Sequence, residues 1–345
     1  PSATIRGQIL TGSKLATLGE DLWRLSSEGV QRAVVNQSDA NSVIRFSRWS
    51  EVRQTLASNV ISALALDSQS RLWAGTFRNG IDVLGPSGTP VAHVESESAR
   101  EINSLVEDGM TKKMLAASSA GLLSFDASLG TKEHLSVANG LLGNSVMQVT
   151  QLDDGHVERS MLVLATSKGL SLGMQGKFRG VTTVQGLPSN SLYAVLDHGG
   201  KLYVGTLGGL AILQDGRVSR VLRDTNSKLT NNWVTALCAV GPRVFAGTYG
   251  GGLFELTASG ELRPFLPEIG RAVVNPNALW SDGNRLYIGT LDGALMVDLN
   301  SQQLIRIRRE MPARTVLSIT GDERYVYFGT TAGIARIGHR YLSRD

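Results

Sequence analysis

A threonine or serine recurs at the end of a short apolar segment along most of the chain, and its spacing limits the folds open to this sequence. The series is Thr17, Thr76, Ser118, Thr166, Thr206, Thr248, Thr290 and Thr330. The successive intervals are 59, 42, 48, 40, 42, 42 and 40 residues. A repeat near this length that is built of four short strands is typical of a propeller blade. The spacing therefore predicts an all-β propeller.

The segment Trp233–Phe265 shows the repeat most clearly. Apolar strands alternate there with turns rich in glycine and proline, which supply the positive or restricted φ angles that hairpins need. The chain holds 39 glycines in 345 residues, well above the usual share of about 7%. This excess agrees with many short strands joined by tight turns.

The number of blades follows from the number of repeats. Eight copies nearly fill the 345 residues, so we favour eight four-stranded blades in a single domain that covers residues 1–345. The copy around Thr17 departs most from the others, and seven blades with an N-terminal hairpin is the alternative. In the last copy, the residues after Gly333 leave enough chain for a short fourth strand.

Composition excludes several classes of function. The 34 basic residues nearly match the 30 acidic ones, which argues against a nucleic-acid binder. No apolar run approaches the roughly 18–20 residues of a membrane helix. The five histidines and the single Cys238 show no spacing typical of a metal site, and no glycine-rich phosphate loop opens a helix. We therefore expect no metal, no cofactor and no enzymatic activity.

Three copies carry the motif of a known repeat. They are GLPSNSLYAVLDHGGKLYVGTLGGLAIL (186–213), LTNNWVTALCAVGPRVFAGTYGGGLFEL (229–256) and RLWAGTFRNGIDVL (71–84). These copies resemble the two-component regulator propeller repeat. The resemblance implies the extracytoplasmic sensor portion of a hybrid histidine kinase. Because this chain has no membrane helix, kinase region or response-regulator region, we expect a standalone relative or an isolated sensor fragment.

The turn after the second strand differs from copy to copy, as expected of a scaffold that presents an asymmetric recognition surface. In a propeller these turns open on the face where the first strands begin. Ordinary solvated turns are the alternative interpretation. The candidate recognition residues are Phe77, Arg78, Asn79, Lys168, Tyr249 and Asp292.

Two further groups are candidate partner contacts. Arg45, Arg48 and Trp49 lie in the longest interval between copies, and Arg and Trp are enriched at interface hot spots. Arg306 and Arg308 share one face of an outermost strand, because alternate residues of a strand point to the same side. They form either a docking strip for an acidic partner or anionic membrane surface, or a charged edge that prevents aggregation.

These observations favour a non-catalytic recognition or assembly module, which is a protein-interaction scaffold or an accessory subunit of a larger complex. One alternative is an extracytoplasmic sensor of a small-molecule ligand, and a second is a propeller lyase. The chain begins with Pro1 rather than Met. From this start and from the resemblance we expect a processed protein or a segment of a longer chain, located in the periplasm or secreted.

Overall fold

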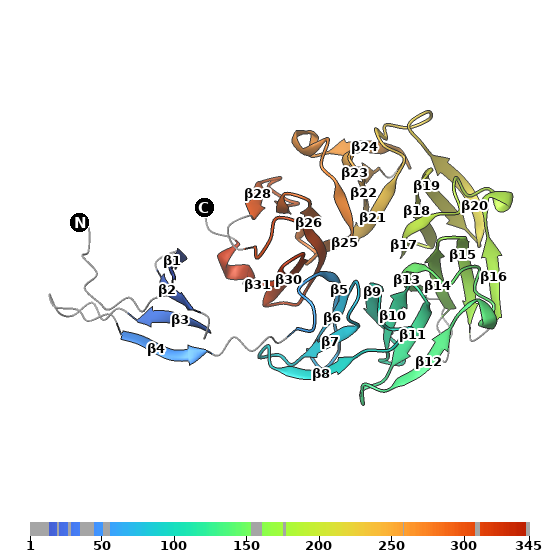
Figure 1. Cartoon of the computed structure of the whole chain (residues 1–345). Coiled ribbons are helices and arrows are strands. Elements are labelled where there is room, and N and C mark those ends of the chain that lie inside the picture. Colours follow the sequence, from blue (N-terminus) through green and yellow to red (C-terminus); the bar gives the residue numbers. More distant parts are fainter. Residues whose placement is uncertain are drawn as a thin grey trace. The chain divides into compact units, whose positions relative to one another are not determined.

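The computed structural model describes residues 56–152, 161–174, 177–257, 259–307 and 311–342, together with the backbone of residues 14–18, 21–26, 29–34 and 45–50. The chain separates into two compact units, Pro1–Thr55 and Leu56–Asp345. The larger unit is a ring of seven sheets, and the smaller holds one four-stranded sheet (Figure 1). Because the units are described separately, the single domain over residues 1–345 stays a prediction.

The ring has seven blades, so the eight-bladed prediction is wrong. The copy around Thr17 forms its own sheet in the smaller unit, and a four-stranded sheet stands where the alternative expected a hairpin. The strands of this sheet follow one another in the order of the sequence. They are β1 (Lys14–Leu18), β2 (Asp21–Ser26), β3 (Gly29–Val34) and β4 (Arg45–Ser50).

Blades 1 to 3 are antiparallel meanders of four strands each. Blade 1 contains β5 (Ile61–Leu66), β6 (Leu72–Thr76), β7 (Ile81–Leu84) and β8 (Pro90–Val94). Blade 2 contains β9 (Ile102–Glu107), β10 (Met114–Ser118), β11 (Gly121–Phe125) and β12 (Thr131–Leu135). Blade 3 contains β13 (Val146–Leu152), β14 (Met161–Thr166), β15 (Gly169–Met174) and β16 (Lys177–Val181).

Blades 4 to 6 repeat the same meander. Blade 4 contains β17 (Leu192–His198), β18 (Lys201–Thr206), β19 (Gly209–Gln214) and β20 (Arg217–Leu222). Blade 5 contains β21 (Val234–Val240), β22 (Arg243–Thr248), β23 (Gly252–Leu256) and β24 (Leu262–Phe265). Blade 6 contains β25 (Val274–Ser281), β26 (Arg285–Thr290), β27 (Gly293–Asp298) and β28 (Leu304–Ile307).

Blade 7 has three strands among the described residues, not the four expected from the sequence. They are β29 (Val316–Gly321), β30 (Tyr325–Thr330) and β31 (Gly333–Gly338). After β31 the chain forms a short 3-10 turn, η4 (His339–Tyr341). The ring of His339 holds this turn against its neighbours, since its Nε2 lies 2.8 Å from the carbonyl oxygen of Asp322 and its Nδ1 lies 3.2 Å from the hydroxyl of Tyr287 in blade 6.

Short 3-10 turns also occur in three connections between blades, η1 (Val137–Asn139), η2 (Thr183–Gln185) and η3 (Pro267–Ile269). Among the described residues, no helix is long and apolar enough to span a membrane.

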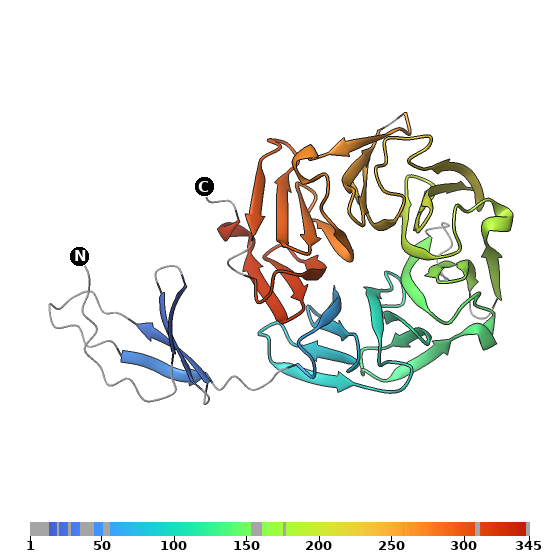
Figure 2. The same ribbon diagram turned by 45° about the horizontal axis from the view of Figure 1, so that its top comes forward.

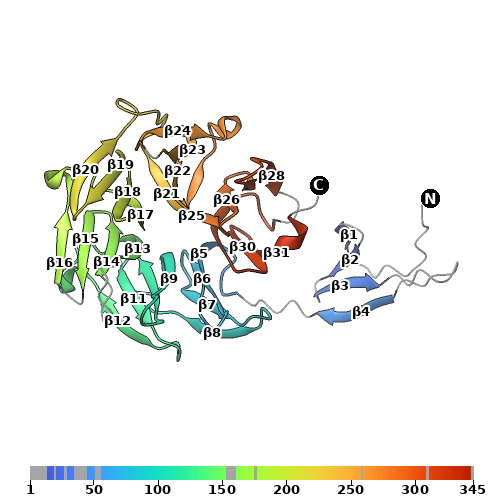
Figure 3. The ribbon, with the colours of Figure 1, turned by 180° about the vertical axis from the view of Figure 1, so that it is seen from behind.

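The first strand of every blade lies nearest the axis of the ring, and the views from the two sides and at an angle agree on this (Figures 1, 2 and 3). Each first strand contacts the first strand of the next blade, and β29 contacts β5, so the ring closes on itself. In such a meander, the turns between second and third strands lie on the same side as the connections between blades. We call this side, where the first strands begin, the top face, and the other side the bottom face.

Glycine in the second strand allows neighbouring blades to pack closely. A Cβ at Gly247 would lie 2.5 Å from Val274 Cγ1, the first residue of the next blade. The same relation joins blade 7 to blade 1, where a Cβ at Gly329 would lie 2.8 Å from Ile61 Cγ2. Real Cβ contacts are not this short, so these positions require the smallest residue. In these two blades the glycine before the repeated threonine is therefore a packing requirement.

The repeated threonine holds the turn after the second strand. Thr248 Oγ1 donates a hydrogen bond to the carbonyl of Gly252 (3.0 Å) and accepts one from the N–H of Gly251 (3.1 Å). All seven blades make this pair of bonds, with Ser118 in place of threonine in blade 2. The hydroxyl thus bridges two backbone groups of the tight turn.

Replacing Thr248 by valine should lower the free energy of unfolding by about 1–3 kcal/mol. Valine keeps the shape of the side chain but removes the hydrogen bonds that the hydroxyl makes with the backbone of Gly251 and Gly252. Urea unfolding of the full chain measures the difference. Thr225→Val is the control, because Thr225 is exposed and its hydroxyl forms no hydrogen bond with a described residue. Equal unfolding midpoints for the two variants would contradict this account.

The first strand of blade 6 carries an insertion that crosses the axis. Val274 pairs with Thr290 and Leu279 with Ile288, so this strand holds two residues more than its counterpart in blade 5 before regular pairing resumes. Asn277 in this bulge adopts a left-handed φ of 57°. Its side-chain amide donates a hydrogen bond to the backbone carbonyl of Asn103 in blade 2. The axial channel is therefore obstructed by a side chain.

Candidate functional site

The top face displays the turns that the sequence singles out. Phe77, Arg78 and Asn79 follow Thr76 in blade 1, and Lys168 lies two residues after Thr166 in blade 3. Asp292 occupies the position of Lys168 in blade 6, and in both turns the backbone N–H donates to the hydroxyl of the repeated threonine. The scaffold is thus the same in each blade while the exposed tip differs.

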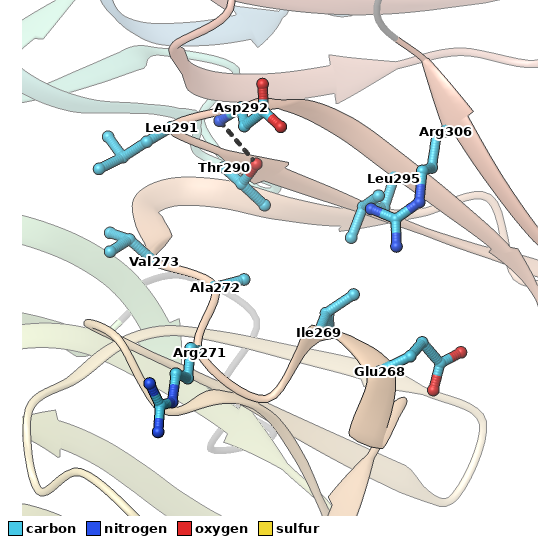
Figure 4. A pocket seen from close by; sticks show the side chains of 10 residues that line it. All are labelled: Glu268, Ile269, Arg271, Ala272, Val273, Thr290, Leu291, Asp292, Leu295 and Arg306. Atoms are coloured by element: carbon cyan, nitrogen blue, oxygen red, sulfur yellow. Dashed lines mark hydrogen bonds between the residues drawn. The ribbon is translucent and has the colours of Figure 1, made fainter.

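A cleft of about 370 Å³ opens on the top face where the connection from blade 5 meets blade 6 (Figure 4). We call it the 5/6 cleft. One wall is the connection between η3 and β25, and the other is the turn after β26 with the adjoining parts of β27 and β28. Its lining residues are Glu268, Ile269, Arg271, Ala272, Val273, Thr290, Leu291, Asp292, Leu295 and Arg306.

Local sequence places the first wall. Leu266 has a left-handed φ of 58°, and Pro267 starts the η3 turn with the fixed φ that suits it. The N–H of Gly252 in blade 5 donates to the carbonyl of Ala272 (3.1 Å). A Cβ at Gly252 would lie 2.9 Å from the carbonyl oxygen of Ile269, so the glycine-rich turn of blade 5 lets the connection approach.

The cleft combines charged side chains with an apolar floor. Ile269 and Leu295 are buried, whereas Arg271 and Arg306 are exposed and form no hydrogen bond or ion pair with a described residue. Asp292 Oδ1 lies 3.7 Å from the guanidinium Nη1 of Arg314. In Figure 4, Arg306 points into the cleft, while Arg271 at the other end of the cleft points away from it.

Three aromatic rings lie beside this cleft on the same face. The rings of Trp233 and Tyr249 stack with centroids 4.3 Å apart, and the ring of Tyr193 lies 5.1 Å from Trp233. Tyr249 forms a backbone bridge with Val273 of the cleft wall, so the cluster and the cleft are neighbours. Trp233 Nε1 is buried and has no hydrogen-bond partner in the described part of the chain.

The aromatic cluster lies where a series of hydrogen bonds between neighbouring blades is incomplete. In blade 1, Ser62 donates to the carbonyl of Ile102 at the start of the next first strand, and Thr235 of blade 5 donates likewise to Val274. Asn103, Asn275 and Ser318 do the same in blades 2, 6 and 7. In blade 3 the place of Ser62 is taken by Met147. In blade 4 it is taken by Tyr193, whose side chain packs on Trp233.

The predicted site residues are dispersed over the top face. Of the six recognition candidates, Asp292 lines the 5/6 cleft and Tyr249 is bridged to its wall. Arg306 also lines the cleft, although the sequence suggested it as part of an outer docking strip with Arg308. Arg308 and the side chains of Arg45, Arg48 and Trp49 lie outside the described residues. Their partner contacts stay predictions.

Sequence reasoning missed Arg271, Tyr193 and Trp233. Trp233 directly precedes a first strand, where the other copies carry Val60, Glu101, Ser145, Ser191, Val273 or Thr315. A comparison of the copies at this position would have marked the tryptophan as an outlier. No comparable signal marks Arg271. The connections between blades differ in length from copy to copy, so its position cannot be aligned with a position in the other copies.

In the described part of the chain, two further clefts between blades open on the bottom face. The one between blades 3 and 4 measures about 680 Å³ and the one between blades 4 and 5 about 370 Å³. The larger one is lined by Leu152 and Met161, which flank residues outside the described part of the chain. The 5/6 cleft contains two of the residues chosen from sequence, Asp292 and Arg306.

The described residues offer little that resembles an active centre. No group of three or more His, Cys, Asp or Glu side chains among them could hold a metal ion. His93 on the outer strand of blade 1 binds Asp82 of the third strand, and His134 contacts the carbonyl of Ala120. His198 lies at the end of β17 and lines both bottom-face clefts. The absence of enzymatic activity stays a prediction.

Comparisons with known proteins agree with this architecture. Residues 55–78 match the family model described as two component regulator propeller. No curated protein matches the chain. The fold is similar to that of the extracellular domain of a putative hybrid two component system from B. thetaiotaomicron, with a TM-score of 0.68 and 15% identity over 96% of this chain. The chain spans 52% of the length of that domain.

Two other solved structures share the fold at low identity. A computationally designed protein aligns with a TM-score of 0.57 and 14% identity, covering 94% of this chain and 95% of the other. Virginiamycin B lyase from Staphylococcus aureus aligns with a TM-score of 0.62 and 10% identity, covering 81% and 94%. The chain therefore carries a two component regulator propeller repeat and has the β-propeller fold found in an extracellular domain of a two component system.

Proposed function

We propose that this chain is a ligand-recognition module of the extracytoplasmic sensor type, and that its ligand binds in the 5/6 cleft. The volume of the cleft, about 370 Å³, falls in the usual range of about 300–1,000 Å³ for small-molecule sites. Its lining also has the usual composition, an apolar floor with a few charged groups at the rim. The likeness to the extracellular domain of a two component system supports the same class of function and an extracytoplasmic location.

The cleft is the observation that carries this proposal, because the axial channel is a poorer site. Asn277 reaches across the axis to Asn103, so a ligand could not enter there without displacing it. In a sensor, ligand binding must change the conformation or the stability of the elements next to the site. The 5/6 cleft meets this need, since its two walls come from the connection that joins blade 5 to blade 6 and from blade 6 itself.

A thermal-shift screen of a metabolite library on the full chain tests the proposal. A ligand that binds only the folded state raises the stability by about 2.7 kcal/mol at a concentration of 100 times its Kd, and should raise Tm accordingly. Ala272→Phe fills the cleft and should abolish the shift. Gln214→Phe, in a bottom-face cleft, is the matched control and should retain it. A shift that survives Ala272→Phe would place the site elsewhere.

A second candidate is the docking of a protein partner on the top face. Four large apolar side chains occupy the same position after the repeated threonine and remain 40–46% exposed. They are Phe77, Leu207, Tyr249 and Leu291. Exposed apolar surface of this kind is typical of interaction sites. The assembly role that we infer from the sequence therefore stays a proposal.

Affinity capture by the full chain from its native source tests the docking candidate. Leu207→Asp should abolish capture of a specific partner. Val91→Asp should not, because Val91 is equally exposed but lies on the outer strand of blade 1. Capture that is unchanged by Leu207→Asp would contradict docking on the top face.

A further inference from the structure

We propose that the 5/6 cleft selects a small organic anion, whose charged group binds Arg306 and whose apolar body lies on Ile269 and Leu295. This inference rests on the proposed function and specifies the chemistry of the ligand. Carboxylates and phosphate esters share this chemistry, since both accept two parallel hydrogen bonds from a guanidinium.

The sheet does not neutralise the charge of Arg306. On the outer strand of blade 5, Arg263 faces Glu255 across the strand pair and binds it at 2.7 Å. Arg306 on the outer strand of blade 6 instead faces Leu295 across the strand pair. It has no hydrogen bond or ion pair with a described residue, and it points into the cleft (Figure 4). A cation held over an apolar floor in this way lacks the counter-charge that an anionic ligand would supply.

The two carboxylates that line the cleft compensate little of this charge. Asp292 is already associated with Arg314, at 3.7 Å. Glu268 points away from the cleft and forms no ion pair with a described residue (Figure 4). Arg271, at the other end of the cleft, also points away from it (Figure 4). Of these four charged side chains, the one that points into the cleft without an ion pair to a described residue is Arg306, so the cleft favours a negatively charged group.

The floor of the cleft requires an apolar part of the ligand. Ile269 and Leu295 are 6% and 4% exposed, and Ala272 and Leu291 complete the apolar lining. An inorganic ion without an organic part would contact Arg306 but leave the apolar floor exposed to solvent. Binding of an organic anion removes apolar surface from water at about 25 cal/mol per Å², which adds to the charged hydrogen bonds.

Four probes that each contain six carbons test the inference by ligand-observed NMR titration of the full chain. They are hexanoate, hexyl phosphate, hexylamine and hexanol. We expect one or both anions to bind. The comparison of hexanoate with hexyl phosphate then shows whether the cleft prefers a carboxylate or a phosphate group. Arg306→Gln should weaken that binding about ten- to hundredfold, as expected for the loss of a charge-assisted hydrogen bond. Arg306→Lys should recover part of it.

Arg217→Gln is the matched control, because Arg217 is an exposed arginine on the outer strand of blade 4. It should leave binding unchanged. Hexanol that binds as tightly as hexanoate, or anion binding that is insensitive to Arg306→Gln, would overturn the inference. If hexanol bound and Ala272→Phe blocked it, the anion preference would be wrong while the proposed function stood. Failure of all four probes would also overturn the anion preference, and the library screen would decide the proposed function independently.

Discussion

Replacing Gly329 by alanine should lower the free energy of unfolding by about 1–3 kcal/mol, because the added methyl group overfills a close-packed contact. The new Cβ would lie 2.3 Å from Ser318 Oγ and 2.8 Å from Ile61 Cγ2. Ile61 belongs to blade 1 and Gly329 to blade 7, so the clash falls on the junction that closes the ring. Urea unfolding of the full chain measures the change.

Gly109→Ala is the control for this substitution. A Cβ at Gly109 would meet only Gln151 Oε1, at 4.0 Å. The control should therefore unfold at the midpoint of the unchanged chain. Equal stability of Gly329→Ala and Gly109→Ala would show that blades 7 and 1 do not pack as described, and the seven-bladed ring would be wrong.

Glu255→Gln should lower the free energy of unfolding by about 2 kcal/mol at neutral pH. Hydrogen bonds to a charged group contribute about 1.5–3 kcal/mol each, and the contribution of Arg263 is reduced because its side chain is partly solvated. Glu255 as a whole residue is 5% exposed. It accepts hydrogen bonds from Arg243 Nε at 2.7 Å and from Arg263 Nη2 at 2.7 Å. The guanidinium of Arg243 also lies 4.9 Å from the ring centroid of Phe245. The substitution leaves both arginines without their counter-charge.

The same network makes stability depend on pH. Burial by itself would raise the pKa of Glu255, but the hydrogen bonds and charges of Arg243 and Arg263 outweigh it and lower the pKa. Asp67 behaves alike, as hydrogen bonds from Trp73 and Arg71 overcome the effect of burial and lower its pKa. Both groups therefore contribute stability that is complete above their unfolded pKa values of about 4 and is lost as the pH falls below them.

Urea unfolding at two pH values checks this account. The difference between the unchanged chain and Glu255→Gln should be largest at pH 7 and should shrink as Glu255 becomes protonated in acid. Glu261→Gln is the control, because Glu261 is exposed and its carboxylate forms no ion pair with a described residue. A difference that is equal at neutral and acidic pH would mean that the charge of Glu255 does not stabilise the fold.

The strand and turn pattern predicted the blades well, because each blade is held by local contacts. The repeated threonine bonds to backbone groups only two to four residues away. The number of blades could not be predicted in the same way. Eight copies exist, but ring closure depends on the contact of Gly329 with Ile61, residues far apart in the sequence, and repeat counting contains no information about that contact.

The candidate site was predicted in part. Asp292 was chosen as a turn tip and Arg306 as part of a charged strand, and only the folding of β27 against β28 places both at one cleft. Arg271 lies in a connection that follows no repeat, so its role depends on the path that Leu266 and Gly252 impose on the backbone. The crossing of the axis by Asn277 was likewise beyond prediction, because its partner Asn103 belongs to another blade.

Hydrogen–deuterium exchange of the full chain, with and without a ligand found in the screen, tests the central claim most directly. If the ligand occupies the 5/6 cleft, exchange should slow in residues 268–273 and 290–295, which form its two walls. The segments 197–202 and 213–216 on the bottom face should exchange as before. Protection confined to those bottom-face segments, or no protection in either wall of the 5/6 cleft, would contradict the account.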